Sequence, residues 1–325
     1  MKPKILITHP IPDSGIKMLR DKFNVELNDY HGILDKTTLI ELARDKDVLL
    51  SLLSDSIDSE VIEECRNLKI ISNYAVGFNN IDLKAATAKG IYVTNTPRTL
   101  DETTADFIFA LILSISRRVV ESDNFMRTGK FEGWGAMDFL GFDVYNSTLG
   151  IVGMGNIGKA VGRIAYYGFL MKVIYSDKFI DTKQLKFGAE NVDFDTLLTE
   201  SDFVTINVPL KEDTYHLIGE RELNMMKKTA FLINTSRGPV VDENALYNAL
   251  KEKRIAGAAI DVYEDEPGFV KGLEKLDNIV MTPHIASATI QTRQLMSYKA
   301  AQNIIDYFNG KIPEGLVNTE VLKRK

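Results

Sequence analysis

The sequence predicts an α/β protein made of two lobes, each a doubly wound parallel sheet. Short apolar runs alternate with helical patterns along most of the chain, which is typical of parallel strands joined by crossover helices. With 325 residues the chain is also longer than one typical domain. A glycine-rich motif near residue 155 begins a second series of strands. We therefore expect two sheets, each with helices on both faces.

The first lobe is predicted to occupy residues 1–97 and to end near Pro97. Helical patterns fill the intervals between its short apolar runs. The strands are expected at residues 4–8, 25–27, 48–52, 69–72 and 91–94. An order of strand, helix and strand at this spacing favours a parallel sheet.

The stretch from 149 to 177 has the features of a dinucleotide-binding unit. An apolar strand, Thr148–Val152, leads into glycines 153, 155 and 158 in the pattern G-x-G-x-x-G, and a helical pattern follows. Gly153 permits the tight turn, Gly155 lets the backbone approach a pyrophosphate, and Gly158 allows close packing of helix on strand. The strand before the motif and the helix after it make dinucleotide binding the favoured interpretation.

An acidic residue follows the glycine motif at the distance that such units require. Asp177 stands 19 residues beyond Gly158, at the end of the next predicted strand. A carboxylate there accepts hydrogen bonds from the adenosine ribose and repels a 2′-phosphate, so NAD(H) is predicted in preference to NADP(H). The neighbouring Lys178 could weaken this discrimination.

Two apolar segments separate the first lobe from the glycine motif. Thr103–Arg118 reads as a helix that is hydrophobic on all sides, so we expect it between the lobes or in a subunit contact. Residues 127–147 have no regular period but contain several aromatic residues and the single tryptophan, Trp134. A long apolar loop of this kind suggests a dimerisation arm that packs on a partner chain.

Alternation of strands and helices resumes after the glycine motif. Further strands are predicted at 203–207, 230–234, 256–260 and 279–281, and a last long helix at 287–308. We expect this helix to return to the first lobe. The predicted domains are therefore 1–97 plus 287–325 and, for the second, 98–286.

Composition excludes several classes of function. The net charge of −6 argues against nucleic acid or an anionic membrane as the main partner. The N-terminal stretch runs directly into a strand without a signal-peptide pattern, no apolar run reaches transmembrane length, and Cys65 is the only cysteine. These features predict a cytoplasmic protein. No group of Cys, His and Asp has metal-ligand spacing, so no metal is expected.

Three ionisable residues stand just beyond predicted strands of the second lobe. Arg237 follows FLINTS, Glu266 follows AAIDVYED, and His284 follows IVMTP. Ligands of doubly wound sheets bind outside the carboxyl ends of the strands. Reduction of a carbonyl by hydride transfer requires a substrate anchor, a proton donor and a group that orients the donor. These residue types at these places suit that chemistry.

Five segments together resemble the NAD-dependent D-2-hydroxyacid dehydrogenases, and among them the glyoxylate/hydroxypyruvate reductase-like members. They lie in the family's order through nearly the whole chain: NYAVGFNNID (73–82), the glycine motif, MKKTAFLINTSRGPVVD (226–242), AGAAIDVYEDEP (256–267) and TPHIAS (282–287). The resemblance implies a flavodoxin-like substrate lobe and a Rossmann cofactor lobe with a cleft between them. The first segment departs from the family pattern at Phe78-Asn79, where many members carry an acidic residue.

The resemblance implies a role for each site residue. Arg237 would bind the substrate's carboxylate or carbonyl oxygen, His284 would donate the proton, and Glu266 would pair with His284 and orient it. The backbone N–H groups of Val76 and Gly77 would hold the carboxylate. Ser54, after the third strand of the first lobe, would lie within reach of the substrate.

The cofactor residues are assigned in the same way. Val208 and Pro209 would line the adenine pocket, and Asp261 would fix the nicotinamide carboxamide. The full set of expected cofactor contacts is Thr104, Gly153, Gly155, Asn156, Ile157, Gly158, Asp177, Val208, Pro209, Thr214, Thr235, Arg237, Asp261 and His284.

The resemblance therefore implies an oxidoreductase that transfers a hydride between NAD(H) and a small 2-keto or 2-hydroxy acid, with reduction of glyoxylate or hydroxypyruvate first. A homodimer through the cofactor domain would be the assembled form. Trp134 lies where reductase-like members place an aromatic residue that can complete a partner subunit's pocket. Two alternatives stay open: a D-lactate- or sugar-acid-type dehydrogenase, and a non-enzymatic NAD-sensing interaction protein of the same fold.

Overall fold

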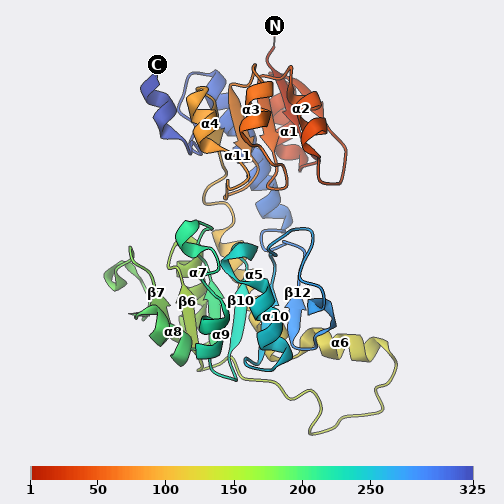
Figure 1. Ribbon diagram of the computed structural model, residues 1–325, viewed down its shortest axis with the longest axis vertical. Coiled ribbons are helices and arrows are strands. Elements are labelled where there is room, and N and C mark those ends of the chain that lie inside the picture. Colours follow the sequence, from red (N-terminus) through yellow and green to blue (C-terminus); the bar gives the residue numbers. More distant parts are fainter. Residues whose placement is uncertain (1, 325) are drawn as a thin grey trace. The chain divides into compact units, whose positions relative to one another are not determined.

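The computed structural model describes residues 2–324 (Figure 1). Met1 and Lys325, the outer ends of the two predicted first-lobe segments, lie outside the described residues. The chain divides into two compact units. Unit 1 contains the residues up to Leu100 and those from Ala288 onward, and unit 2 contains Asp101–Ser287.

Unit 1 is built on a five-stranded parallel sheet in the order β2-β1-β3-β4-β5. The strands are β1 (Lys4–Ile7), β2 (Asn24–Leu27), β3 (Val48–Ser51), β4 (Ile70–Asn73) and β5 (Tyr92–Thr94). This is the strand order of flavodoxin-like folds, in which the chain reverses its direction of winding between β1 and β3. The predicted doubly wound sheet is confirmed for this unit.

Helices cover both faces of the unit 1 sheet. They are α1 (Asp13–Arg20), α2 (Lys36–Ala43), α3 (Ser59–Glu64), α4 (Leu83–Ala88) and α11 (Ile290–Phe308), followed by a 3₁₀ segment, Thr319–Arg324. Helices α1 and α11 pack on one face, and α2, α3 and α4 pack on the other. Aspartates 35, 58 and 82 begin three of these helices, and each carboxylate accepts a backbone N–H three residues on, which satisfies a free helix donor.

Unit 2 contains a seven-stranded parallel sheet in the order β12-β11-β10-β9-β6-β7-β8. The strands are β6 (Thr148–Val152), β7 (Lys172–Ser176), β8 (Glu190–Asn191), β9 (Phe203–Ile206), β10 (Phe231–Asn234), β11 (Gly257–Ile260) and β12 (Ile279–Met281). Winding reverses between β6 and β9, as in the Rossmann fold. The short strand β8 was not predicted, because two exposed polar residues carry no apolar pattern.

The helices of unit 2 also form two layers. Helices α5 (Asp101–Ser116) and α7 (Asn156–Gly168) share one core with the sheet, whereas α8 (Phe194–Glu200), α9 (Glu220–Met225) and α10 (Glu243–Lys251) share the other. Four 3₁₀ turns complete the elements: Thr182–Gln184, Glu212–Thr214, Gly238–Val240 and Leu273–Lys275. No helix within residues 2–324 has the length and apolar character to cross a membrane.

The all-round hydrophobicity of α5 has a different cause from the one predicted. The sequence suggested a position between the lobes or in a subunit contact, but α5 packs inside unit 2 against α7 and strands β10 to β12. Ile108 and Ile112 are completely buried there, and Phe109 stacks on Phe169 with ring centroids 4.9 Å apart. The helix is apolar because it is covered on one side by the sheet and on another by α7.

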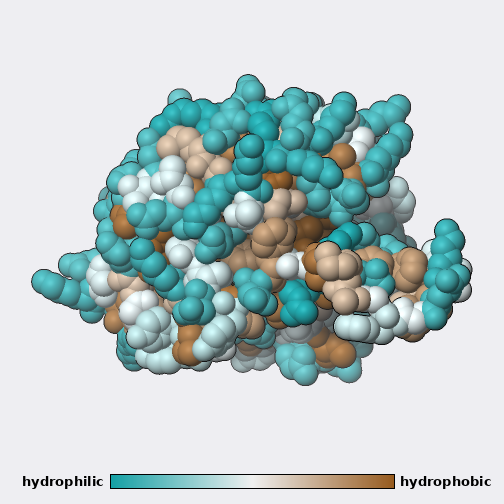
Figure 2. Space-filling model, turned by 90° about the horizontal axis from the view of Figure 1, so that it is seen from below, coloured by the Kyte–Doolittle hydropathy of each residue, from teal (hydrophilic) through white to brown (hydrophobic). Residues whose placement is uncertain are grey.

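Residues 119–147 form the most exposed apolar part of unit 2. Helix α6 (Val119–Arg127) follows a left-handed residue, Arg118, and leads into an irregular segment. We call residues 128–147 the arm. Trp134 is 87% exposed and Met137 is 78% exposed. Figure 2 shows apolar side chains on the protrusion at the right, where Figure 1 places α6.

Candidate active site

The glycine turn lies at the carboxyl end of β6, beside the switch point of the unit 2 sheet. Gly153 has φ +91°, and a Cβ there would lie 2.7 Å from a Val208 methyl carbon. A Cβ on Gly158 would lie 2.3 Å from the Gly153 carbonyl oxygen. Both positions therefore exclude a side chain. A Cβ on Gly155 would meet nothing within 4 Å, so this face of the turn has room for a ligand.

Helix α7 begins directly after Gly155, which is its N-cap and offers no side-chain cap. The first N–H groups of a helix have no partner within it, and they lie at the positive end of the helix dipole. Asn156 and Ile157 are the first two helical residues. This end of α7 therefore suits an anionic group such as a pyrophosphate.

Asp177 follows β7, and its carboxylate is held by the backbone around the glycine turn. One oxygen accepts the Met154 N–H at 2.8 Å, and the other accepts the N–H groups of Phe179 at 2.7 Å and Ile180 at 3.1 Å. The side chain is half-buried, and Lys178 beside it is exposed. These bonds fix the carboxylate next to the turn and occupy part of its capacity to accept hydrogen bonds.

In the segment after β9, the side chain of Thr214 forms hydrogen bonds with backbone groups of the same segment. The Thr214 hydroxyl donates to the Pro209 carbonyl at 2.7 Å and accepts the Lys211 N–H at 2.8 Å. Val208 is half-buried and lies against the glycine turn, whereas Pro209 is exposed. Thr214 therefore shapes the loop that carries Val208 and Pro209.

Arg237 lies in a turn that Asn234 organises at the end of β10. The Asn234 amide oxygen accepts the Ser236 N–H at 3.0 Å, and its NH₂ group donates to the Arg237 carbonyl at 3.0 Å. Thr235, Ser236 and Arg237 are half-buried. Burial lowers the pKa of the Arg237 guanidinium, and the negative charge of Glu266 opposes this shift. The sequence analysis did not identify Asn234, which looked like an ordinary strand residue.

Glu266 and His284 form a hydrogen-bonded pair. The His284 Nδ1 lies 2.9 Å from one Glu266 carboxylate oxygen, and the other oxygen accepts the Tyr263 N–H at 3.1 Å. Burial alone would raise the pKa of Glu266. The bond and charge of His284, the Tyr263 N–H and the Arg237 charge together hold that pKa below its usual value. Glu266 is therefore an ionised carboxylate that orients the imidazole ring.

The loop that carries His284 is held by Asp261. This aspartate follows β11 and is fully buried; its carboxylate accepts the Thr282 hydroxyl at 2.6 Å and the N–H groups of Ile285 at 2.9 Å and Ala286 at 2.8 Å. His284 has a φ of +54°, which a non-glycine residue adopts only where its surroundings impose it. The three bonds to Asp261 supply that constraint.

Thr104 lies in the first turn of α5 and is buried with 3% exposure. Its predicted contact with the nicotinamide stays a prediction, as does the contact of Asp261 with the carboxamide. The bonds described above show that Asp261 holds the loop of the predicted proton donor.

In unit 1 the predicted carboxylate-binding residues follow β4. The Asn95 amide donates to the Val76 carbonyl and the Asn73 amide donates to the Gly77 carbonyl, each at 2.8 Å. No bond from either the Val76 or the Gly77 N–H to another described residue is found. Two backbone donors are therefore oriented and free, an arrangement that suits an anion. Ser54 follows β3 and is exposed.

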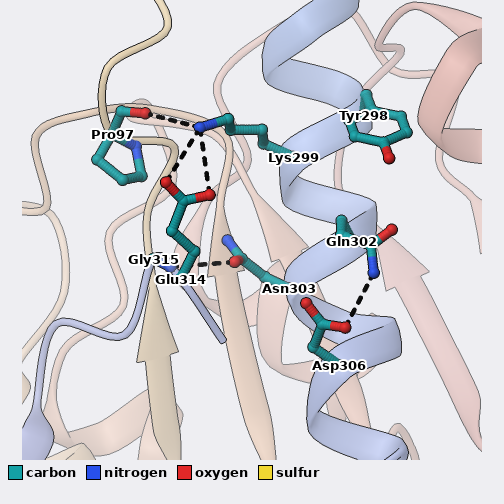
Figure 3. Close-up of a pocket in the computed structure, with 8 residues that line it drawn as sticks. All are labelled: Pro97, Tyr298, Lys299, Gln302, Asn303, Asp306, Glu314 and Gly315. Atoms are coloured by element: carbon teal, nitrogen blue, oxygen red, sulfur yellow. Dashed lines mark hydrogen bonds and ion pairs between the residues drawn. The ribbon is translucent and has the colours of Figure 1, made fainter. Parts of the chain in front are cut away.

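A hollow of about 220 Å³ in unit 1 lies apart from these residues (Figure 3). The Lys299 ammonium donates to the Pro97 carbonyl at 3.3 Å and pairs with Glu314 at 3.4 Å, and Gln302 donates to Asp306 at 2.9 Å. None of the predicted site residues lines this hollow. Across residues 2–324 no group of three or more His, Cys, Asp or Glu side chains is placed to hold a metal ion.

Comparison with known proteins gives a consistent family. The model of the D-isomer specific 2-hydroxyacid dehydrogenase NAD-binding domain matches residues 109–286. A glyoxylate reductase of Korarchaeum cryptofilum is 50% identical, over 99% of this chain and 98% of its own length. The structure of the TT0316 protein of Thermus thermophilus is 36% identical with a TM-score of 0.90, covering 97% of this chain and 99% of its own.

A solved glyoxylate reductase from Paecilomyes thermophila is also similar, with 30% identity and a TM-score of 0.85 over 96% of this chain and 97% of its own. The chain belongs to the D-isomer specific 2-hydroxyacid dehydrogenase family. It is accordingly an oxidoreductase that acts on CH–OH groups with a nicotinamide dinucleotide, and the resemblance predicted from its motifs is confirmed.

Proposed function

We propose that this protein reduces small 2-keto acids, glyoxylate or hydroxypyruvate first, to the D-2-hydroxy acids. The observation that carries the proposal is the Glu266–His284 pair, 2.9 Å between Oε2 and Nδ1, on the same sheet edge as the glycine turn. The charge of Arg237 acts on Glu266 as well. The names of the relatives direct the proposal to glyoxylate.

His284 is proposed as the proton donor. Its Nδ1 faces Glu266, so its Nε2 is the nitrogen available to protonate the oxygen of the carbonyl as that oxygen becomes a hydroxyl. The ionised Glu266 accepts a hydrogen bond from Nδ1 and so fixes the orientation of the ring. When bound, the reduced dinucleotide would supply the hydride.

Arg237 is proposed to bind the α-carboxylate or carbonyl oxygen of the substrate. Its planar guanidinium donates two parallel hydrogen bonds to such groups. The free N–H groups of Val76 and Gly77 would receive the carboxylate, and Ser54 would contact the substrate from a neighbouring loop. The oriented carbonyls of Val76 and Gly77 support this assignment.

The dinucleotide is proposed to lie along the glycine turn. Gly155 leaves room for it, and Gly153 and Gly158 allow the tight turn and the close packing of α7. Asn156 and Ile157 would meet the pyrophosphate at the N-terminus of α7. The remaining proposed contacts are Thr104, Asp177, Val208, Pro209, Thr214, Thr235, Arg237, Asp261 and His284.

We propose that Asp177 makes NADH the preferred reductant, because a fixed carboxylate would repel a 2′-phosphate. In Asp177→Ala the preference for NADH should weaken. The Kd for NADPH divided by the Kd for NADH should fall by about tenfold or more. Fluorescence titration with both nucleotides measures the ratio. Lys183→Ala is the control, because its side chain is exposed in the same segment after β7 and has no assigned cofactor contact. An unchanged ratio in Asp177→Ala would assign the selection to another residue.

A homodimer assembled through the arm is also part of the proposal. Its support is the set of exposed apolar side chains in residues 128–147, including Trp134 and Met137. A cytoplasmic location is proposed because the single cysteine, Cys65, is buried and unpaired, as expected for a protein of a reducing compartment.

The reductase proposal is tested by following NADH absorbance with purified protein and a panel of 2-keto acids. Glyoxylate and hydroxypyruvate should give the highest kcat/KM, and pyruvate and longer sugar acids lower values. If pyruvate or a longer sugar acid gave the highest kcat/KM, the protein would instead be a D-lactate- or sugar-acid-type dehydrogenase. No turnover with any keto acid would contradict an enzymatic role and leave dinucleotide-dependent association as the function to examine.

A further inference from the structure

An ionisable pair outside the proposed catalytic set is buried at the switch point of the unit 1 sheet. His9 follows β1 and Asp55 follows β3, the two strands between which the winding of this sheet reverses. The exposed fraction is 6% for His9 and zero for Asp55. Ligands of flavodoxin-like sheets bind at this place, yet neither residue has a role in the proposed reaction.

The Asp55 carboxylate is only half satisfied by neutral donors. Its Oδ2 accepts the Thr8 hydroxyl at 2.6 Å and the Leu52 N–H at 2.8 Å. Its Oδ1 lies 3.5 Å from the Nδ1 of His9, and neither of these two atoms has a hydrogen-bond partner among the described residues. An unpaired buried polar atom is costly. A proton on either of these two atoms would make it a donor toward the other.

The protonation of this pair follows from the other nitrogen of His9. Its Nε2 lies 2.8 Å from the Gly32 carbonyl oxygen, and a carbonyl only accepts, so Nε2 carries a hydrogen. In a neutral His9 the Nδ1 then carries no hydrogen, and it lies 3.5 Å from the Asp55 Oδ1, which is also an acceptor. Two acceptors would face each other in a buried site unless one further proton lies between them.

We propose that His9 and Asp55 share one proton, and that this proton closes the 52–55 loop and so positions Ser54 and the neighbouring Val76–Gly77 backbone for substrate. Burial raises the pKa of the Asp55 carboxyl, against the bonds from Thr8 and Leu52 and the charge of His9. A carboxyl that holds its proton more firmly in the fold agrees with a shared proton. Loss of that proton at alkaline pH should loosen the loop.

Asn80 transmits the closure of this loop to the carboxylate-binding segment. Its amide donates to the carbonyls of both Leu52 and Asp55 at 3.0 Å, and its oxygen lies 3.2 Å from the Asn73 amide nitrogen. Asn73 in turn donates to the Gly77 carbonyl. The inference rests on the proposed function for the roles of Ser54 and Gly77; the shared proton itself does not. His9 and Asp55 are positioning residues, because they act through these loops.

The groups around His9 and Asp55 include few others that change charge with pH. Thr8 at the end of β1 and the Leu52 N–H after β3 contact Asp55, and both are neutral. The loop that supplies the Gly32 carbonyl also carries three ionisable side chains, Asp29, Tyr30 and His31, all exposed to solvent. Tyr30 lies against Gly32, so it is the neighbour that needs a control.

Asp55→Asn tests the proposal. The amide oxygen can accept from Thr8 and Leu52, and the NH₂ group can donate to Nδ1 of a neutral His9, so the variant needs no shared proton. The KM for glyoxylate of the wild type, divided by that of Asp55→Asn, is measured from pH 6 to 10. Both proteins contain His284 and Glu266, so the titration of that pair cancels in the ratio.

The KM ratio should rise at alkaline pH, by up to about tenfold per pH unit once the proton is lost. The ratio of kcat values should stay nearly constant, because a loosened binding loop removes substrate affinity rather than the chemical step. Tyr30→Phe should keep the wild-type profile. A KM ratio that is constant from pH 6 to 10, or a Tyr30→Phe profile that loses the alkaline rise, would overturn the proposal.

NMR of the histidine ring nitrogens tests the proton without any activity. The chain has four histidines, and His9→Gln identifies the signal of His9. At pH 7 the wild-type His9 should carry a shared or bound proton on Nδ1 in addition to the hydrogen on Nε2. An Nδ1 that reports a free lone pair would overturn the proposal, even if Asp55→Asn fails to fold. Absence of turnover with every keto acid would contradict the proposed function alone.

Discussion

At the scale of residues, the side chains of the site are positioned by carboxylates that accept backbone N–H groups. Glu266 accepts the Tyr263 N–H while it faces His284, and Asp261 accepts two N–H groups of the loop beyond His284. Asp177 does the same for the glycine turn. Each acid therefore has a place set by local backbone before any ligand binds, which is the preorganisation that catalysis by positioned groups requires.

His284→Gln should lower kcat for keto-acid reduction by about 10²–10⁴-fold, because glutamine cannot donate the proton. NADH affinity should change little. Steady-state kinetics and NADH fluorescence measure the two effects. His216→Gln is the control, since His216 also pairs with an acid of unit 2, Glu264, outside the proposed site. Wild-type kcat in His284→Gln would remove His284 from the role of proton donor.

The contribution of Glu266 to the stability of the folded protein should depend on pH in the acid range. Its pKa is lowered in the folded protein, so the folded state binds this proton less readily than the unfolded chain, in which the pKa is about 4.3. The stabilisation is present above that value and is lost as the pH falls through the lower folded pKa. The Tm difference between wild type and Glu266→Gln should therefore shrink from pH 6 to pH 3. A difference that is independent of pH would contradict the ionised pair.

At the scale of elements, the sequence predicted the strands more readily than the contacts of their loops. Arg237, Glu266 and His284 follow β10, β11 and β12, and their places beyond apolar runs were visible in the sequence. Asn73 and Asn95 were not recognised, although they hold the carbonyls of the carboxylate-binding segment. Such bonds depend on which loops meet at a sheet edge, and an asparagine at a strand end has no pattern that shows its partner.

Helix α5 shows that a hydrophobic pattern predicts burial but not the contacts that produce it. An all-round apolar helix must be buried, and it is, but periodicity does not tell which surface covers it. The structure places Ile112 in the core beneath β10 to β12. The arm differs, because large apolar side chains such as Trp134 and Met137 remain exposed within the single chain.

The arm should form the subunit contact. The double variant Trp134→Ser, Met137→Ser removes two side chains that are 87% and 78% exposed, so it should convert a dimer into a monomer without loss of the fold. Sedimentation velocity at micromolar concentration measures the mass. Phe179→Ser is the control, being 85% exposed on another loop of unit 2. A monomeric wild type, or a double variant that retains the dimer mass, would contradict this role.

At the scale of the whole molecule, strand order explains where the functional residues can lie. Both sheets are parallel and doubly wound, and each has one point at which the winding reverses. The glycine turn, Asp177 and Val208 lie at that point in unit 2, and His9 and Asp55 lie there in unit 1. The alternation of apolar runs and helical patterns predicted both sheets. Strand order and the pairing of buried acids needed the structure, since they depend on contacts between distant segments.

The central claim is stereospecific hydride transfer to a 2-keto acid. Its most direct test is to incubate the protein with hydroxypyruvate and NADH and to compare the NADH consumed with the glycerate formed, resolved by chiral chromatography. The account predicts one D-glycerate for each NADH oxidised. Formation of L-glycerate, or consumption of NADH without glycerate, would contradict it.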